Sequence, residues 1–178
     1  MNSTDFKDYL LERPSMREYA AGCADSAAAW AGCDAGHMLA AYVASVASDA
    51  PGDPARIVLQ TVLSRRALPL LVLHYDDPFV KTAVDAVRAF AAGEIDSAQM
   101  HHVTLNAYGG ALRDTADLAT YQRRMLAAHL CEFAEWSPLD PYRREVLASA
   151  LAVDCDRYGV ADDLHALLQN PPRREISP

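Results

Sequence analysis

The chain has 178 residues, of which 51% are hydrophobic and 22% are charged, and its formal net charge is −8 at pH 7. These values are those of an ordinary globular protein, so they exclude a disordered chain. The excess of acids argues against general nucleic-acid binding, which needs a basic face to neutralise phosphates. Aromatic residues make up only 8%, and alanine is abundant, which favours close-packed helices over a sheet core.

The N-terminal stretch MNSTDFKDYLLERP contains acids and lacks the apolar segment of a signal peptide. The longest apolar run, Ala67–Leu73, is too short to span a bilayer. We therefore expect a cytoplasmic protein with no membrane contact. The four cysteines show no Cys-x-x-Cys spacing, and in that compartment they are expected to be reduced, buried thiols. They are Cys23, Cys33, Cys131 and Cys155.

Short helices with strong breakers between them are predicted for the first part of the chain. Thr4 is a suitable cap for a helix over Asp5–Arg13, which Pro14 ends. The next predicted helices are Ser15–Ala21, Ser26–Ala31 and Gly36–Ser48, followed by a loop over Asp49–Asp53.

An Asp-Pro pair occurs three times, and each pair predicts a helix start, because aspartate caps the first turn and proline at the first position loses no hydrogen bond. Asp53-Pro54 opens a predicted helix over Pro54–His74, in which Pro69 should cause a kink or a division. Asp140-Pro141 opens a predicted helix over Pro141–Tyr158, which Gly159 should stop.

The clearest single element is the stretch Asp76–Ile95, with Asp77 as the cap, Pro78 at the first position and Gly93 as the left-handed stop. Its apolar residues recur at helical spacing and predict one buried stripe. They are Val80, Ala83, Val84, Val87, Phe90 and Ala91.

Beyond this helix, Asp96 or Ser97 should start a helix that ends near Tyr108, and Gly109-Gly110 should separate it from a long helix over Ala111–Trp136. A last helix is predicted over Ala161–Gln169. Other core positions are expected at Ile57, Leu112, Leu118, Val146 and Val153. The elements predict an all-α, single-domain bundle of about seven to nine helices over residues 1–170, with a flexible tail over 171–178.

Two Asp-x-x-His pairs are the main candidates for metal chemistry, because side chains three apart share a helix face. They are Asp34 with His37, and Asp162 with His165. A di-iron bundle would need Glu-x-x-His motifs on long core helices, and the chain has none. Capping and surface ion pairs are the alternative interpretation. The sequence also has no P-loop, GxGxxG, GxSxG or HExxH motif, so we expect no cofactor and no catalytic residues.

Tryptophan and paired arginines supply the candidate partner-binding residues. Trp30 and Trp136 are the only tryptophans, and each is expected either in the core or as an interface anchor. Arg123 and Arg124 form one of four arginine doublets. They are expected to lie on solvated faces in salt bridges, or to line a groove for an acidic partner or ligand.

Two segments together resemble a family of small bacterial helical proteins described as immunity proteins. AWAGCDAGHMLAAYV (Ala29–Val43) is similar to that family's Trp-x-x-Cys…Met-Leu segment, and Asp76–Ile95 is similar to its Asp-x-Pro…Gly-Glu-Ile segment. The resemblance covers about a fifth of the chain, has Phe90 where the family has tryptophan, and does not extend past Ile95. It implies a cytoplasmic α-helical protein that neutralises a partner by binding, and it transfers no catalytic residue.

The first functional hypothesis is therefore a non-enzymatic binding protein, of the immunity or phage anti-defence type, that neutralises or senses a protein partner. The net charge suits a basic partner through electrostatic steering. Two alternatives are a small helical enzyme or metal-binding bundle that uses the Asp/His pairs, and a helical domain that senses a small ligand.

Overall fold

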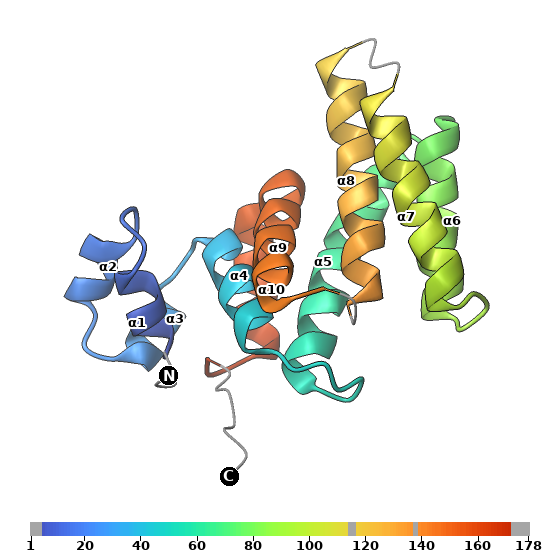
Figure 1. Ribbon diagram of the computed structural model, residues 1–178. Helices are drawn as coiled ribbons and strands as arrows, with labels where there is room; N and C mark the ends of the chain where they lie inside the picture. Colours follow the sequence, from blue (N-terminus) through green and yellow to red (C-terminus); the bar gives the residue numbers. More distant parts are fainter. Residues whose placement is uncertain (1–4, 114–116, 137–138, 172–178) are drawn as a thin grey trace. The chain divides into compact units, whose positions relative to one another are not determined.

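The computed structural model describes residues 5–113, 117–136 and 139–171, and these are all-α, with ten helices and no strand (Figure 1). The predicted all-α class is confirmed, whereas the predicted total of about seven to nine helices is too low. The three short N-terminal helices each lie where a separate helix is predicted, so the error is in the total and not in those segments. The helices are α1 (Phe6–Leu11), α2 (Arg17–Gly22), α3 (Ser26–Ala31), α4 (Gly36–Val46), α5 (Pro54–Val72), α6 (Pro78–Ala91), α7 (Ser97–Leu112), α8 (Leu118–Glu135), α9 (Pro141–Cys155) and α10 (Arg157–Leu167).

Aspartate starts many of these helices, because its carboxylate accepts a backbone N–H of the first turn. This holds for α1, α3, α6, α7 and α8, whose caps are Asp5, Asp25, Asp77, Asp96 and Asp117. All three Asp-Pro pairs open a helix as predicted, at α5, α6 and α9. The cap of α1 is Asp5 and not Thr4, which lies outside the described residues.

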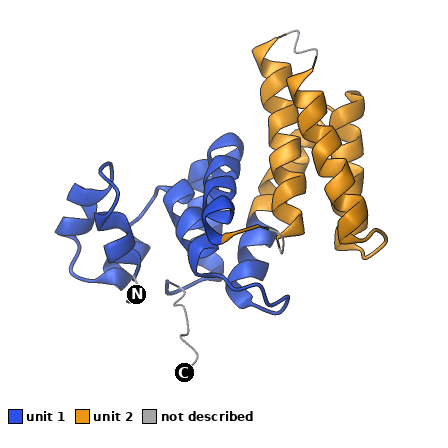
Figure 2. Ribbon diagram, in the orientation of Figure 1, with its two compact units in different colours: residues 1–62, 141–178 blue, residues 63–140 orange. Residues whose placement is uncertain are grey.

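The chain clusters into two compact units, one formed by residues 1–62 with 141–178 and the other by residues 63–140 (Figure 2). That residues 1–170 form a single domain stays a prediction. Of the predicted tail over 171–178, all but Pro171 lies outside the described residues.

In the first unit, α4 packs against α9 and α10, and α1 packs against α2 and α3. An aromatic cluster joins these short helices, since the ring of Phe6 lies 5.2 Å from that of Trp30 and 5.0 Å from that of Tyr42. Gly36 brings α4 close to α10, because a Cβ there would lie 1.9 Å from the carbonyl oxygen of Arg157.

The second unit is built on α6, α7 and α8, which pack on one another in pairs (Figure 1). Four of the predicted stripe residues of α6 are buried, namely Val80, Ala83, Val84 and Val87. Gly93 has the left-handed conformation expected of the stop, with φ +73°. Many of the buried side chains on α7 and α8 are alanines, which lets the helices pack closely.

The predicted break at Gly109-Gly110 is wrong. Helix α7 continues through both glycines to Leu112, and α8 starts only at Leu118. Consequently the predicted helix Ala111–Trp136 is also wrong in its first turns. Gly110 has a packing role in place of a hinge role, because a Cβ there would lie 2.1 Å from the ring of Phe79.

The predicted stop at Gly159 is wrong as well. Helix α9 ends at Cys155, and Gly159 is a buried residue inside α10. A buried glycine within a helix leaves room for a neighbouring element to approach closely. Pro69 lies inside α5 and does not divide it, while the predicted kink stays a prediction.

Several predicted core positions are exposed, because periodicity finds an apolar stripe without showing what covers it. Ile57, Leu112, Leu118, Val146 and Val153 all belong to this group. On α7 the exposed leucines lie opposite the packed face, and this arrangement defines the candidate site.

Candidate functional site

An open groove runs between α6 and α7 in the second unit and has a volume of about 790 Å³. We call it the α6–α7 groove. Small apolar side chains supply much of its surface, and polar side chains contribute at its edges. Its lining residues are Thr82, Asp85, Ala86, Ala89, Ile95, Asp96, Ala98, Gln99, His102 and Val103.

Most of the polar groups in the groove already have partners inside the unit. The carboxylate of Asp85 accepts hydrogen bonds from Tyr75 Oη and from Lys81 Nζ, the latter at 2.5 Å. These two bonds hold the pKa of Asp85 below its ordinary value. The side chain of Asp96 accepts the Gln99 N–H at 2.9 Å, and Gln99 Oε1 accepts the Asp96 N–H at 2.9 Å. The groove therefore offers apolar contact more than free hydrogen-bonding groups.

An exposed stripe on α7 adjoins this groove. We call it the outer stripe, and its residues are Ala98, His102, Leu105, Gly109 and Leu112. Leu105 and Leu112 are 57% and 71% exposed. The opposite face of α7 is buried at Met100, Thr104, Ala107 and Ala111. Helix α7 is thus apolar on two faces, and the described residues cover only one of them.

The two adjacent glycines of α7 differ in their surroundings. A Cβ at Gly110 would collide with Phe79, whereas a Cβ at Gly109 would meet no atom within 4 Å. Packing inside the chain therefore explains Gly110 and does not explain Gly109. A glycine in a helix interior costs about 1 kcal/mol relative to alanine.

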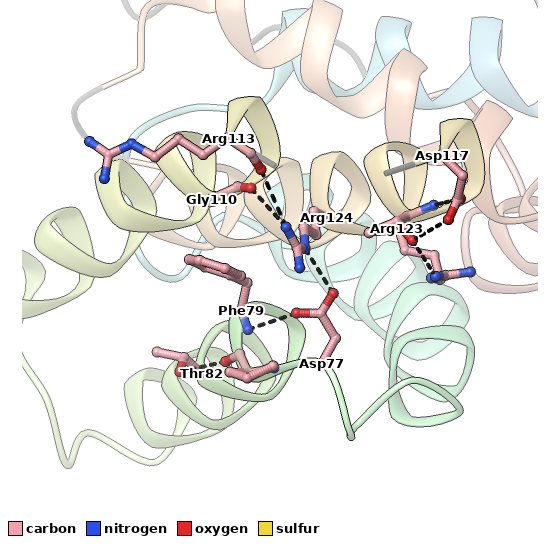
Figure 3. A network of polar contacts seen from close by, with 10 residues as sticks. Asp77, Phe79, Thr82, Gly110, Arg113, Asp117, Arg123 and Arg124 are labelled. Carbon is pink, nitrogen blue, oxygen red and sulfur yellow. Dashed lines mark hydrogen bonds and ion pairs between the residues drawn. The ribbon is translucent and has the colours of Figure 1, made fainter. Parts of the chain in front are cut away.

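Arg124 connects three helices of this unit, as Figure 3 shows. Its Nε donates to Asp77 at 2.8 Å, and its Nη1 donates to the carbonyl oxygens of Gly110 at 3.2 Å and Arg113 at 3.4 Å. Its guanidinium also lies 4.6 Å from the ring centre of Phe79. Arg124 therefore ties the start of α6 and the end of α7 to α8.

Burial alone would raise the pKa of Asp77, but the hydrogen bonds from Arg124 and from the Phe79 N–H hold it below its ordinary value. The neighbouring Arg123 donates to Thr120 Oγ1 at 2.8 Å, in the first turn of α8 that Asp117 caps (Figure 3). Arg123 and Arg124 thus both make contacts within the unit. This agrees with the interpretation in which the doublet makes contacts inside the protein and does not line a groove. Its partner-binding role stays a prediction.

Both tryptophans are buried, with Trp30 1% exposed and Trp136 0% exposed. Trp30 Nε1 donates to the carbonyl oxygen of Leu168 at 3.0 Å. Trp136 lies 5.3 Å from Phe133, ring centre to ring centre. The core interpretation is confirmed for both, and neither indole presents a surface to a partner as the chain is folded.

The Asp/His pairs do not assemble into a metal site. Across the described part of the chain, no three His, Cys, Asp or Glu side chains lie close enough together to hold a metal ion. His165 is engaged elsewhere, because its Nε2 lies 2.8 Å from the carbonyl oxygen of Trp30. Burial and the nearby Arg157 lower the pKa of His37. Asp34, His37, Asp162 and His165 therefore give no support to the metal-binding alternative.

The cysteines are free thiols, as predicted, but only Cys33 and Cys131 are buried, whereas Cys23 and Cys155 are partly exposed. Burial raises the pKa of Cys33 to about 11 and that of Cys131 to about 12, so neither is a thiolate at neutral pH. A buried acid lies near Cys131. The side chain of Glu135 is 3% exposed, and its Oε1 is 3.5 Å from Nδ1 of the exposed His101. Burial raises the pKa of Glu135, and His101 and Thr104 partly offset the effect.

The outer stripe is not among the features predicted from the sequence. Leu105, Gly109 and Leu112 are spaced by four and three residues, which is a helical signal. The signal was hidden because the predicted helix ended at Tyr108 and Leu112 was assigned to the core of the next helix. A break at the two glycines would leave Gly109 outside any helix and would separate Leu105 from Leu112.

Comparison with known proteins gives no relative, since no family model, no curated protein and no solved structure matches the chain. Within the described ranges, none of the helices combines the length and apolar character that crossing a bilayer requires.

Proposed function

We propose that this is a non-enzymatic, cytoplasmic binding protein that neutralises or senses a protein partner, in the manner of an immunity protein or a phage inhibitor of host defence. The observation that carries the proposal is the outer stripe of α7 beside the α6–α7 groove. Clustered exposed apolar residues next to a concave surface are typical of protein interaction sites.

The contacts of the candidate chemical residues support the same conclusion. His165 contacts a backbone carbonyl in the core, and the described residues contain no metal cluster. Arg124 is used to hold three helices together. Because these side chains have structural contacts, the proposal rests on the accessible apolar surface and not on them.

Affinity capture tests the proposal. The tagged protein is recovered from its native cells, or from phage-infected host cells, and the captured proteins are identified by mass spectrometry at low and high salt. The proposal predicts one protein in stoichiometric amount that can be re-formed into a complex from the two purified chains. Repeated captures without such a protein in several growth states would contradict it.

The groove itself favours a second candidate function, the sensing of a small apolar ligand. Its volume of about 790 Å³ lies in the range of about 300–1,000 Å³ that is usual for small-molecule sites. A ligand sensor should gain several degrees in melting temperature with a small molecule, because binding to the folded state stabilises it. Substitution of Ala89 by tryptophan should abolish that gain without a protein partner being involved.

A further inference from the structure

A buried acid ends helix α8 in the second unit. Glu135 is the last residue of this helix, and its side chain is only 3% exposed. Two features of this position oppose a negative charge. Burial removes the hydration of a carboxylate, and the carbonyl groups at a helix C-terminus carry partial negative charge of their own. Glu135 therefore needs a cation beside it when it is ionised.

His101 on α7 can supply that cation. Its Nδ1 lies 3.5 Å from Glu135 Oε1, and its side chain is 60% exposed, so it can exchange protons with the solvent. An imidazole is a cation only when it is protonated, so this ion pair loses its positive member as the pH rises. The buried carboxyl must then either keep its proton or leave the core.

The other groups that act on this carboxyl give no second cation among the described residues. On α8, Glu132 is another acid and raises the pKa of its neighbour, while the buried Cys131 stays neutral because its own pKa is about 12. On α6, which also packs against α8, Lys81 and Arg88 act on Asp85 and lower the pKa of that carboxyl. The imidazole on α7 is therefore the partner through which pH acts on the buried acid.

The residue after Glu135 favours opening of this helix end. Trp136 has φ +51°, and it is the one non-glycine residue with a positive φ in the described part of the chain. A residue with a large side chain rarely adopts this conformation. Its indole is fully buried and packs on Phe133, with 5.3 Å between the ring centres. Opening of the last turn of α8 would relieve the backbone strain and uncover the indole.

From this geometry we propose that the His101–Glu135 pair is a pH-sensitive latch on the C-terminal turn of α8, closed at acidic pH and loosened as the pH rises. The carboxyl stays in the core while it is protonated or paired with the imidazolium. Once both groups have lost their protons, an unpaired carboxylate is left buried, and the turn over residues 131–136 opens to hydrate it. The latch goes beyond the proposed binding function and does not depend on it, because all of its parts belong to this chain.

The direction of the response follows from proton linkage. Burial raises the pKa of Glu135 in the folded chain. Such a group stabilises the closed form at pH values below its unfolded pKa, and this contribution is lost as the pH rises through the folded pKa. Each unit between the two pKa values changes the closing equilibrium by a factor of about ten. The open fraction should therefore increase towards alkaline pH, and a permanent cation at position 101 should reduce the increase.

Hydrogen–deuterium exchange of the full chain at pH 5 and pH 8 tests the latch. Each variant is compared with wild type at the same pH, so that the intrinsic pH dependence of exchange cancels. Glu135→Gln keeps a neutral side chain of similar size at both pH values. The two proteins should exchange alike at pH 5. At pH 8 the amides of residues 131–136 should exchange severalfold faster in wild type, while those of α4 and α9 in the first unit should not differ.

Two lysine substitutions separate the pair from a general effect of charge. His101→Lys keeps a cation beside Glu135 at both pH values, so it should slow the exchange of residues 131–136 at pH 8 towards the rate of Glu135→Gln. His102→Lys is the matched control, because it adds the same charge one residue along α7, on a side chain that lines the α6–α7 groove. It should leave the exchange of residues 131–136 unchanged.

Three results would overturn the proposal. The first is equal exchange of wild type and Glu135→Gln at pH 8. The second is an equal effect of lysine at positions 101 and 102, which would show that net charge and not the pair controls this helix end. The third is faster exchange spread evenly over α6, α7 and α8, which would mean that the buried acid destabilises the whole unit and does not act as a latch.

Discussion

Substitution of Gly110 by alanine should destabilise the protein, although alanine is the better helix former. The new Cβ would lie 2.1 Å from Cδ1 of Phe79, well inside van der Waals contact. Phe79 would have to move, and its stacking with the guanidinium of Arg124 at 4.6 Å would be disturbed. Overpacking of this kind costs about 1–3 kcal/mol, against a gain of about 1 kcal/mol in helix propensity.

Gly109→Ala is the matched control, because it gains the same propensity and meets no neighbour within 4 Å. It should raise the free energy of unfolding by about 1 kcal/mol, so that Gly110→Ala lies about 1–3 kcal/mol below it. Urea denaturation monitored by circular dichroism measures both. In a Phe79→Ala background the difference between the two alanine variants should disappear. Equal stabilities of the two variants in the wild-type background would refute the reasoning.

Three further substitutions test the contacts described above. Burial raises the pKa of Glu135, so its stabilising contribution is present at pH values below its unfolded pKa of about 4.3 and is lost as the pH rises through the folded pKa. Glu135→Gln should therefore melt above wild type at pH 8, with a difference that shrinks towards pH 4, and a lower melting temperature at pH 8 would contradict this. Arg124→Ala should lower the free energy of unfolding by about 1–3 kcal/mol at pH 7. The loss should be smaller at acidic pH, where Asp77, whose pKa is held low, becomes protonated. Urea titrations at pH 7 and pH 2.5 test this, and equal losses at the two pH values would count against the ion pair. Trp30→Phe removes the donor to the Leu168 carbonyl oxygen at 3.0 Å and should cost about 1–3 kcal/mol, and a thermal melt unchanged from wild type would show that this hydrogen bond contributes little.

Much of the fold is predictable from local signals. Some signals act through the backbone of the residues beside them, so their effects can be predicted from the sequence. They are the Asp-Pro pairs, the aspartate caps and the Gly93 stop. The central helix from Pro78 to Ala91 follows from such signals together with an apolar stripe.

Glycines inside helices are where local reasoning fails. The sequence GG at 109–110 is a plausible break by propensity, yet α7 continues because tertiary packing outweighs a propensity cost of about 1 kcal/mol per glycine. Gly159 is a similar case, because it is buried within α10. Whether a glycine ends a helix or admits a neighbour depends on residues far away in the sequence, such as Phe79 for Gly110.

The candidate site was less predictable than the fold. Periodicity shows that Leu105 and Leu112 share a helix face, but not that this face is left exposed. The burial of Trp30, and the contact of His165 with the carbonyl oxygen of Trp30, likewise depend on segments that are distant in sequence. His165 and Arg124, which were candidates for chemistry or binding, make structural contacts. Leu112, which was predicted to lie in the core, is exposed.

Hydrogen–deuterium exchange of the free protein and of its complex with the captured partner tests the central claim most directly. The claim is that the protein acts by binding a partner through the outer stripe and the α6–α7 groove. It predicts new amide protection in residues 82–113, because backbone groups there become covered. Protection confined to residues 5–62 or 141–171, or a complex that leaves residues 82–113 unchanged, would contradict it.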